Sequence, residues 1–359
     1  MSKYQRPNIR RMDGYSWGEQ PQDRQTIKLN TNENPYPPSP AVADALSNFT
    51  AAELRTYPQP TADVMREHIA KLHDLSTRQV VVTHAGDEAL RLAITTYVSP
   101  GGTFASTDPS YSLYPVLAQI QDARTLRVDL EANWSIPPDF PAQARAADAQ
   151  LTCLVNPHAP SGYLTPVEQL HRIAEEISGV LLIDEAYADF VDPKIGYTSR
   201  ELVTQHDNVL VLRTFSKGYS LAGLRLGYLL GAEELITPII EKTRDTYNID
   251  AISQSLGIAA LQDQDYARAT WEKVREQRQF LAQTLNDLGW SCLASEGNFL
   301  LSTPPPNSIG AAEIYKRLKA EGILVRYFDH PRLHDKLRIS IGTKEQNKVL
   351  LENLRHLCR

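Results

Sequence analysis

Cysteine is scarce in this sequence: the 359 residues include only Cys153, Cys292 and Cys358. An odd number of widely separated cysteines fits neither a disulfide framework nor a CxxC metal site. We therefore expect a chain that holds no metal and resides in a reducing compartment, the cytoplasm.

Long apolar runs and runs of basic residues are also missing. No apolar stretch is long enough to span a bilayer, and residues 1–15 are polar, without the apolar core of a signal peptide. Lysine and arginine number 37 against 43 aspartates and glutamates, a net charge of −6. This composition argues against a nucleic-acid partner, and we expect neither nucleic acid nor a membrane as a partner.

Short apolar runs alternate with helical patterns between about residue 60 and residue 230. Helical spacing is found at residues 61–72, 88–97 and 167–177, and apolar or β-branched runs at 80–82, 151–155, 180–183, 209–212 and 226–230. Short buried strands that alternate with helices predict a largely parallel sheet with helices on both faces. Ligands of such sheets bind at the carboxyl ends of the strands.

The pattern changes after about residue 265. A long amphipathic helix is expected over residues 271–288, and strands at 298–302, 323–326 and 337–341 accompany a helix at 311–320. At the other end of the chain, the prolines between residues 35 and 40 indicate an extended arm. We therefore predict an N-terminal arm over residues 1–40, a large domain over 41–260 and a smaller α+β domain over 261–359.

Polar residues follow two of the expected strands. Residues 83–88 (THAGDE) form a small-residue turn into a helix, whose free backbone N–H groups suit a phosphate. The alternative is that Asp87 simply caps this helix. Asp184 follows the strand at 180–183, where a carboxylate points into the ligand crevice. Its alternatives are a helix cap and a magnesium ligand, but no GxxxxGK[ST] precedes it, so the nucleotide interpretation fails.

Lys217 lies in a segment of small and apolar residues after the strand at 209–212. A lysine in such surroundings partly loses its preference for the charged form, which is what imine chemistry requires. Arg225 follows beside two glycines, and together with the hydroxyls of Thr214 and Ser216 the two cations suit a phosphate dianion. The alternative is a surface lysine and a surface arginine, which the neighbouring glycines and hydroxyls disfavour.

Together these segments resemble the fold-type I pyridoxal 5′-phosphate (PLP) aminotransferases, in particular the histidinol-phosphate aminotransferase group. The matching text is GYSWGE at 14–19, KLNTNENPY at 28–36, TFSKGYSLAGLRLG at 214–227 and LRISIGT at 337–343. The resemblance implies an α/β fold in which helices sandwich a mostly parallel seven-stranded sheet, with a smaller α+β domain. It also implies a PLP cofactor, a homodimer, and small-molecule substrates: histidinol phosphate and 2-oxoglutarate, giving imidazole acetol phosphate and glutamate in histidine biosynthesis.

The resemblance implies a role for each of several residues. Lys217 would hold the cofactor as an imine and shuttle protons, Asp184 would keep the pyridine nitrogen protonated, and Tyr187 would donate to the phenolic oxygen. The other implied contacts are Ala85, Gly86, Asp87, Ser216 and Arg225 around the phosphate, Tyr111 on the ring face, the partner subunit's Tyr57 at the phosphate, and Arg338, Arg326 and Tyr15 on the substrate. The alternatives are that the tyrosines are ordinary half-buried aromatic side chains, and that Arg326 and Arg338 face solvent and form ion pairs there.

One position departs from the family pattern. The loop at 156–162 reads NPHAPSG where the family has NPxNP[ST]G, so Ala159 replaces an asparagine that donates to the cofactor's phenolic oxygen. An alanine side chain cannot donate, and the lost hydrogen bond costs on the order of 1 kcal/mol if another group compensates. His158 and Tyr187 are the candidates for compensation.

Other activities are open on the same scaffold. One is an aminotransferase for aromatic amino acids. Another is a lyase similar to the threonine-phosphate decarboxylases, which use the same lysine, aspartate and phosphate site but break a different bond at the α-carbon. A third is a relative that only binds a ligand or a partner, which the joint presence of Lys217, Asp184, Tyr111 and Arg225 disfavours.

Overall fold

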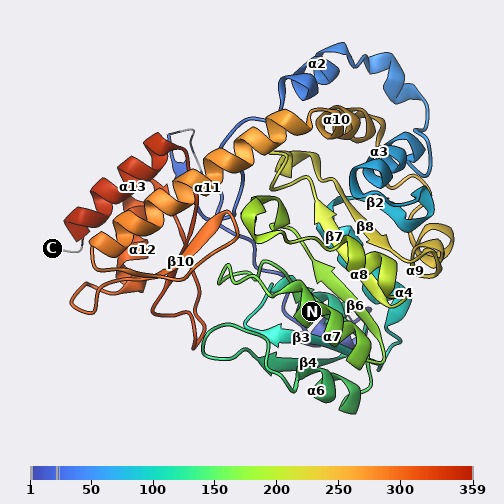
Figure 1. The fold of residues 1–359 in the computed structure, drawn as a ribbon, viewed down its shortest axis with the longest axis horizontal. Helices are drawn as coiled ribbons and strands as arrows, with labels where there is room; N and C mark the ends of the chain where they lie inside the picture. The colour runs from blue at the N-terminus through green and yellow to red at the C-terminus, as the bar shows by residue number, and fades with distance from the viewer. Residues whose placement is uncertain (1–2, 22, 24, 358–359) are drawn as a thin grey trace.

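The computed structural model describes residues 3–21, 23 and 25–357, so Cys358 lies outside the described residues. Figure 1 shows two groups of elements joined by the long helix α11 (Gln264–Asp287): a large sheet wrapped by helices, and a smaller group that contains the end of the chain. In the described part of the chain, no helix combines the length and apolar character that a membrane span requires.

The larger sheet has seven strands in the order β2-β8-β7-β6-β5-β3-β4. They are β2 (Val80–Thr83), β3 (Thr103–Asp108), β4 (Arg124–Asp129), β5 (Ala149–Val155), β6 (Val180–Asp184), β7 (Val209–Thr214) and β8 (Gly227–Gly231). Strand β8 runs antiparallel to its neighbours β2 and β7, and the other pairs of this sheet are parallel. The predicted fold class, with a mostly parallel seven-stranded sheet between helices, is confirmed.

Helices cover both faces of this sheet because its central strands are apolar on both sides. Along β6, Leu181 and Ile183 pack in one core cluster, while Val180 and Leu182 pack in another. The first cluster also holds residues of α2 (Pro40–Asn48), α3 (Asp63–His73), α6 (Phe140–Ala146), α7 (Val167–Glu176), α8 (Arg200–Gln205) and α10 (Ala251–Gln262). The second holds residues of α4 (Ala85–Tyr97), α5 (Leu113–Ile120) and α9 (Glu233–Pro238). Burial on both faces is why these strands read as continuous apolar runs.

Two strands of the larger sheet are not predicted from the sequence. Strand β3 reads TFASTD, and its Thr103, Ser106 and Thr107 are buried although they are polar. Strand β4 reads RTLRVD and lies at the sheet edge, where most of its residues are exposed or half-buried. Neither strand therefore shows the apolar, β-branched run that marks the others.

The smaller sheet is antiparallel, with strands in the order β12-β13-β10-β9. These are β9 (Ser291–Cys292), β10 (Phe299–Thr303), β12 (Arg326–Tyr327) and β13 (Leu337–Ser340). Helices α11, α12 (Ala311–Ala320) and α13 (Lys344–Leu357) share a third core cluster with it. Helix α12 begins and ends where its periodicity predicts, whereas the domain boundaries after residues 40 and 260 stay a prediction.

The N-terminal segment joins the carboxyl-terminal part of the chain through a two-stranded sheet. Strand β1 (Ile27–Lys28) pairs in parallel with β11 (Ile323–Leu324). The prediction of one strand over residues 323–326 is wrong, because β11 pairs with β1 while β12 pairs with β13, and Val325 lies between them. A change of strand partner is invisible to a periodicity argument, since both pieces are extended.

The remaining elements are short helical segments. They are α1 (Pro7–Arg11), the 3-10 helices η1 (Ala51–Arg55), η2 (Thr77–Gln79), η3 (Ala188–Phe190), η4 (Pro193–Ile195) and η5 (Ala222–Leu224), and the π-helix η6 (Ile239–Thr243). Segments η3 and η5 lie in the loops after β6 and before β8, which carry several of the predicted site residues.

Candidate active site

The predicted site residues gather at one edge of the larger sheet. Asp184 is the last residue of β6, Lys217 lies shortly after the end of β7, and His84 joins β2 to α4. Strands β2, β6 and β7 point the same way, because β8 between β2 and β7 is antiparallel to both. Their carboxyl ends therefore meet at the edge where open α/β sheets bind ligands.

Asp184 is buried at this edge, with 5% of its surface exposed. One carboxylate oxygen accepts a hydrogen bond from Tyr114 Oη at 2.8 Å, and the other accepts one from the backbone N–H of Ala186 at 3.1 Å. Burial raises the pKa of Asp184 to about 6, although both hydrogen bonds oppose the rise. A buried carboxylate of this kind is stabilised in its charged form by an adjacent cation, so the site suits a protonated nitrogen.

Lys217 faces the N-terminal segment, where its Nζ donates a hydrogen bond to the carbonyl oxygen of Thr31 at 2.7 Å. Burial lowers the pKa of Lys217 to about 8; Glu33 opposes this change, while the nearby Arg338 and Arg225 add to it. The uncharged amine is therefore accessible near neutral pH, as a lysine that bonds covalently to a carbonyl carbon requires.

The turn before α4 and the loop before β8 form a narrow cradle. Ala85 begins α4 with φ 64°, and Arg225 has φ 57°, so both lie in the left-handed region. A Cβ at Gly227 would lie 2.9 Å from the carbonyl carbon of Ala85 and 3.1 Å from the backbone nitrogen of Gly86. The close approach of the two backbones thus requires glycine, and the first N–H groups of α4, which have no partner within the helix, are available to an anion.

Polar side chains complete this cradle. Ser216 is buried, and its Oγ accepts a hydrogen bond from Thr214 Oγ1 at 2.9 Å. Arg225 Nη2 pairs with Asp87 Oδ2 at 2.9 Å, and Tyr111 Oη donates to Asp87 Oδ1 at 3.4 Å. The structure therefore brings together the residues predicted to surround a phosphate and links them to Tyr111.

Tyr111 stands among other tyrosines. Its ring centre lies 6.0 Å from that of Tyr15 and 5.5 Å from that of Tyr114, and both pairs meet edge to face. Burial raises the pKa of Tyr111, so its phenol stays protonated. Tyr15 is thereby placed at the site for which it is predicted, although it is distant from Tyr111 in the sequence.

Two arginines face each other on the smaller sheet: Arg326 on β12 is directly opposite Arg338 on β13. Arg338 Nη2 donates to the carbonyl oxygen of Asn30 at 2.7 Å, while its buried Nε has no partner among the described residues. Phe299 and Phe328 each lie 5.5 Å from the Arg338 guanidinium. Within residues 3–21, 23 and 25–357, neither arginine pairs with a carboxylate. Opposed like charges repel, so the pair favours an anionic ligand over the solvent-facing ion pair considered above.

Tyr187 lies near both Arg338 and Asp184, whose charges act on its phenol. Its ring packs edge to face on Phe299, with centres 5.0 Å apart, and Ala159 shares the same small apolar cluster. Its Oη accepts a hydrogen bond from Asn32 Nδ2 at 3.1 Å. Burial raises the pKa of Tyr187, while the charge of Arg338 and the bond from Asn32 oppose that rise.

Tyr57 lies apart from the other predicted site residues. Its side chain is 80% exposed, and its ring stacks on that of Tyr247 with centres 4.5 Å apart. This pair presents a flat aromatic surface outward, and Tyr57 makes none of the contacts described above for the other site residues within its own chain.

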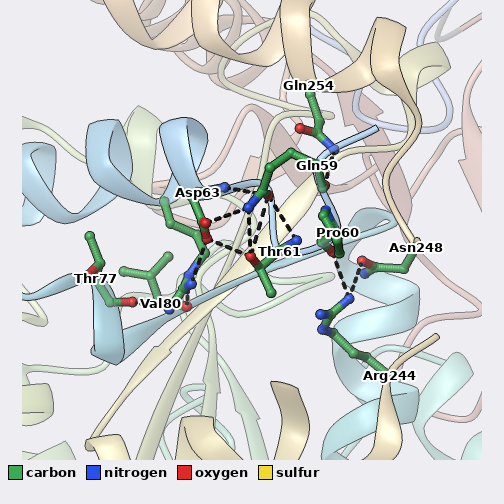
Figure 2. A network of polar contacts seen from close by, with 10 residues as sticks. Gln59, Pro60, Thr61, Asp63, Thr77, Val80, Arg244, Asn248 and Gln254 are labelled. Atoms are coloured by element: carbon green, nitrogen blue, oxygen red, sulfur yellow. Dashed lines mark hydrogen bonds and ion pairs between the residues drawn. The ribbon is translucent and has the colours of Figure 1, made fainter. Parts of the chain in front are cut away.

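A polar network fixes the loop that follows Tyr57 (Figure 2). Gln254 Nε2 donates to the carbonyl oxygen of Gln59 at 2.9 Å, and Arg244 Nη1 donates to that of Pro60 at 2.9 Å. Arg244 also contacts Asn248 Oδ1 at 3.4 Å. The loop is therefore held against α10 and against the segment between η6 and α10, which also carries Tyr247.

Three consecutive residues of the N-terminal segment contact the site and are not predicted as site residues. The carbonyl of Asn30 binds Arg338, the carbonyl of Thr31 binds Lys217, and the side chain of Asn32 binds Tyr187. Two of these contacts use backbone atoms, for which a sequence carries no residue-type signal. The third uses a side chain, and the only sequence signal for it is that Asn32 lies in the segment KLNTNENPY, which carries the resemblance to the family.

The family follows from comparison with known proteins. Residues 24–354 match the family described as aminotransferase class I and II. This chain belongs to that family. The histidinol-phosphate aminotransferase 1 of Trichormus variabilis is 42% identical to this aminotransferase over 360 residues, covering 100% of both chains. The histidinol-phosphate aminotransferase of Geotalea daltonii is 41% identical over 348 residues, covering 96% of this chain and 97% of its own. The predicted family is confirmed.

A solved structure agrees with this aminotransferase along its whole length. The crystal structure of histidinol-phosphate aminotransferase from Sinorhizobium meliloti in complex with pyridoxal-5′-phosphate has a TM-score of 0.91 and covers 100% of this chain and 98% of its own. The two sequences are 24% identical, so the likeness shows a shared fold. The predicted fold-type I architecture is confirmed by a structure whose sequence has diverged widely.

Proposed function

We propose that this aminotransferase uses PLP to transfer the amino group of histidinol phosphate to 2-oxoglutarate, giving imidazole acetol phosphate and glutamate. The observation that carries the proposal is the pair of opposed arginines, Arg326 and Arg338, which have no carboxylate partner among the described residues and lie at the same site as Lys217. The full-length identity of 42% with a histidinol-phosphate aminotransferase supports it. The reaction is a step of histidine biosynthesis.

The residues present fit the cofactor. The cradle between Ala85 and Gly227 has room for backbone contacts only, which suits a phosphate held by N–H groups, with Ser216 and Arg225 beside it. Asp184 lies buried and without a cation among its contacts, as a partner for a protonated ring nitrogen must. When bound, PLP supplies an aldehyde that takes up the substrate's amino group and a ring that withdraws electrons from the reacting carbon.

Each side chain then has a defined task. Lys217 Nζ would hold the cofactor as an imine, formed with the aldehyde by loss of water, and its amine would serve as the base for the proton on the substrate's α-carbon. Asp184 holds a proton at the ring nitrogen through its negative charge. Tyr187 would donate a hydrogen bond from its hydroxyl to the cofactor's phenolic oxygen, and Tyr111 would pack against the ring face.

The substrate's anionic groups are bound on the side of the smaller sheet. Arg338 binds the anionic group next to the reacting carbon. Its Nε–H group has no acceptor among the described residues, and Asn30 and two phenylalanines fix its guanidinium. Arg326 and Tyr15 help to hold the phosphate of histidinol phosphate, which takes the place of an α-carboxylate, or the second carboxylate of glutamate.

We also propose that the enzyme is a cytoplasmic homodimer. The exposed stack of Tyr57 and Tyr247 supports an interface, since large exposed aromatic groups on a rigid loop are typical of surfaces that bind a second protein. In the dimer, the partner subunit's Tyr57 contacts the cofactor's phosphate. Cys153 and Cys292 are free thiols, which is compatible with a reducing compartment.

A panel of amino donors tests the proposed reaction. Purified enzyme is mixed in single half-reactions with histidinol phosphate, glutamate and phenylalanine, and the cofactor's conversion from its aldehyde form to its amine form is followed by absorbance. We expect rapid conversion by histidinol phosphate and glutamate and slow conversion by phenylalanine. Fastest conversion by phenylalanine would favour an aromatic aminotransferase, and release of carbon dioxide from a phosphorylated amino acid without conversion would favour the lyase.

A further inference from the structure

Asn32 is held in one orientation by three hydrogen bonds. Its backbone N–H donates to Ser340 Oγ at 2.9 Å, its carbonyl oxygen accepts from Asn298 Nδ2 at 2.8 Å, and its Oδ1 accepts from Ser340 Oγ at 2.9 Å. The residue is 1% exposed and has φ 58°, a conformation that asparagine tolerates better than most residues. Both its backbone and its amide group are therefore fixed.

This orientation makes the amide nitrogen of Asn32 the group that faces Tyr187. Ser340 Oγ already accepts from the backbone N–H of Asn32, so its hydroxyl proton goes to Oδ1, and Nδ2 is left to donate to Tyr187 Oη at 3.1 Å. Because Tyr187 Oη accepts this bond, its own proton remains free to be donated elsewhere. The charged or titratable groups around Tyr187 are Arg338, Asp184, Tyr15 and Tyr111.

In the family, the loop that corresponds to residues 156–162 provides a second hydrogen-bond donor to the cofactor's phenolic oxygen, but in this chain the loop offers none. Ala159 packs with Val155 and Phe299 and has no polar side-chain atom. His158 is committed to the loop itself, since its Nε2 lies 2.9 Å from the carbonyl oxygen of Pro109 and its Nδ1 lies 2.7 Å from Ser161 Oγ. Burial lowers the pKa of His158 to about 4, so the ring is neutral and both nitrogens are used. Of the two candidates for compensation, Tyr187 is left.

We propose that Asn32 is a positioning residue that acts through Tyr187, the donor that remains where the amide at position 159 is absent. By donating to Tyr187 Oη, Asn32 aims the phenol proton at the cofactor's phenolic oxygen and strengthens the phenol as a donor, because hydrogen bonds in a chain polarise one another. The proposal rests on the PLP function proposed above.

The strength of the hydrogen bond to the cofactor's phenolic oxygen determines the pH at which the lysine-bound nitrogen loses its proton. A strong donor stabilises the negative charge of that oxygen and weakens its hold on the proton shared with the lysine-bound nitrogen. Loss of the Asn32 bond weakens the donor, so the proton is held to higher pH. The visible absorbance of the bound cofactor changes when this proton is lost, and the pH at which half of the change has occurred is the midpoint.

The test is a double-mutant cycle on that midpoint in the holoenzyme. We expect Asn32→Gly, which tolerates the left-handed backbone, to raise the midpoint by about half a pH unit to one unit, the range of a single net hydrogen bond. In a Tyr187→Phe background, the same Asn32→Gly change should leave the midpoint unmoved. Asn32→Asp keeps the size and backbone preference but accepts from Tyr187, so it should raise the midpoint further than Asn32→Gly.

Two further variants bracket the cycle. Asn8→Ala removes an amide that donates to the carbonyl of Gln119 at 2.8 Å, from the same arm but without contact to Tyr187, and should leave the midpoint unchanged. Ala159→Asn supplies the missing donor directly and should lower the midpoint.

The outcomes separate this inference from the proposed function. A shift by Asn32→Gly that is equal in the wild-type and Tyr187→Phe backgrounds, or no shift in either, overturns the positioning role. Equal shifts for Asn8→Ala and Asn32→Gly also overturn it, because they indicate a general loosening of the arm. A wild-type enzyme that binds no PLP, or binds it without the visible band of an imine, contradicts the proposed function itself.

Discussion

Burial moves the pKa values of Lys217 and Asp184 toward each other: the lysine falls to about 8 and the carboxyl rises to about 6. Both pKa values therefore lie close to neutral pH, so either group gains or loses its own proton there at little cost in free energy. The shifts have one physical cause, removal from water at the carboxyl edge of the sheet, and Arg338 adds to it for the lysine.

The raised pKa of Asp184 predicts a pH-dependent stability of the cofactor-free protein. The folded chain binds a proton at Asp184 that the unfolded chain releases, so this residue contributes stability below its unfolded pKa, near 4, and loses it as pH rises to about 6. We expect the free energy of unfolding of wild type, relative to Asp184→Asn, to fall between pH 4 and about 6. Urea titrations of both apoproteins measure it, and a difference that is flat or rises over this range contradicts the buried environment.

The sequence predicts the strand-end residues well and the arm contacts poorly, for a physical reason. Asp184, Lys217 and Arg225 follow strands whose apolar runs are visible, so their position at the ligand edge can be inferred from order alone. Asn30 and Asn32 reach the same place through contacts with residues more than 150 positions away. No local pattern encodes such contacts, because they depend on how the arm crosses the finished fold.

At the scale of elements, the approach of α4 to β8 determines the cradle. A Cβ at Gly227 would meet backbone atoms of Ala85, Gly86 and Arg213, none of which can move without shifting α4 or β7. We predict that Gly227→Ala weakens PLP binding by roughly five- to hundredfold, since overpacking costs about 1–3 kcal/mol. Gly223→Ala is the matched control, because a Cβ there meets nothing within 4 Å. Fluorescence titration of the apoproteins with PLP measures both, and equal affinities would mean that the cradle is not where the phosphate binds.

The pairing of β12 with β13 predicts how substrates are distinguished. Arg338→Ala should weaken glutamate, histidinol phosphate and phenylalanine alike, by roughly ten- to hundredfold, because each loses a charge-assisted hydrogen bond. Arg326→Ala and Tyr15→Phe should weaken mainly glutamate and histidinol phosphate, which carry an anion far from the reacting carbon or a phosphate. Apparent affinities from half-reactions decide the matter. Equal losses for phenylalanine in all three variants would remove the assignment of the two arginines to different groups.

Strand prediction succeeds where both faces are buried and fails where they are not. The strands β5, β6 and β7 are found within two residues of their predicted bounds because their apolar runs are uninterrupted. Strand β4, at the sheet edge, and the polar strand β3 lack such runs. The single strand predicted over residues 323–326 is divided into β11 and β12, which pair with different strands. Pairing partners are a property of the assembled sheets, which a local pattern does not contain.

At the scale of the whole molecule, the exposed Tyr57 predicts a site shared between subunits. A heterodimer of a Tyr57→Ala chain and a Lys217→Ala chain contains one site with both residues intact, if Tyr57 acts on the partner's cofactor. Coexpression with two different tags isolates this heterodimer, and we expect about half of the wild-type activity from its single complete site. Each homodimeric variant is the control. A heterodimer no more active than the better homodimer would show that Tyr57 does not act across the interface.

The fold brings the N-terminal arm, the carboxyl edge of the larger sheet and Arg338 of the smaller sheet close to one lysine, Lys217. Reduction of the holoenzyme with borohydride, followed by proteolysis and mass spectrometry, identifies the side chain to which the cofactor is bound. We predict a single reduced adduct on Lys217, and none in a folded Lys217→Ala variant. An adduct on another lysine, or no adduct in a wild-type enzyme that has bound PLP, would contradict the central claim.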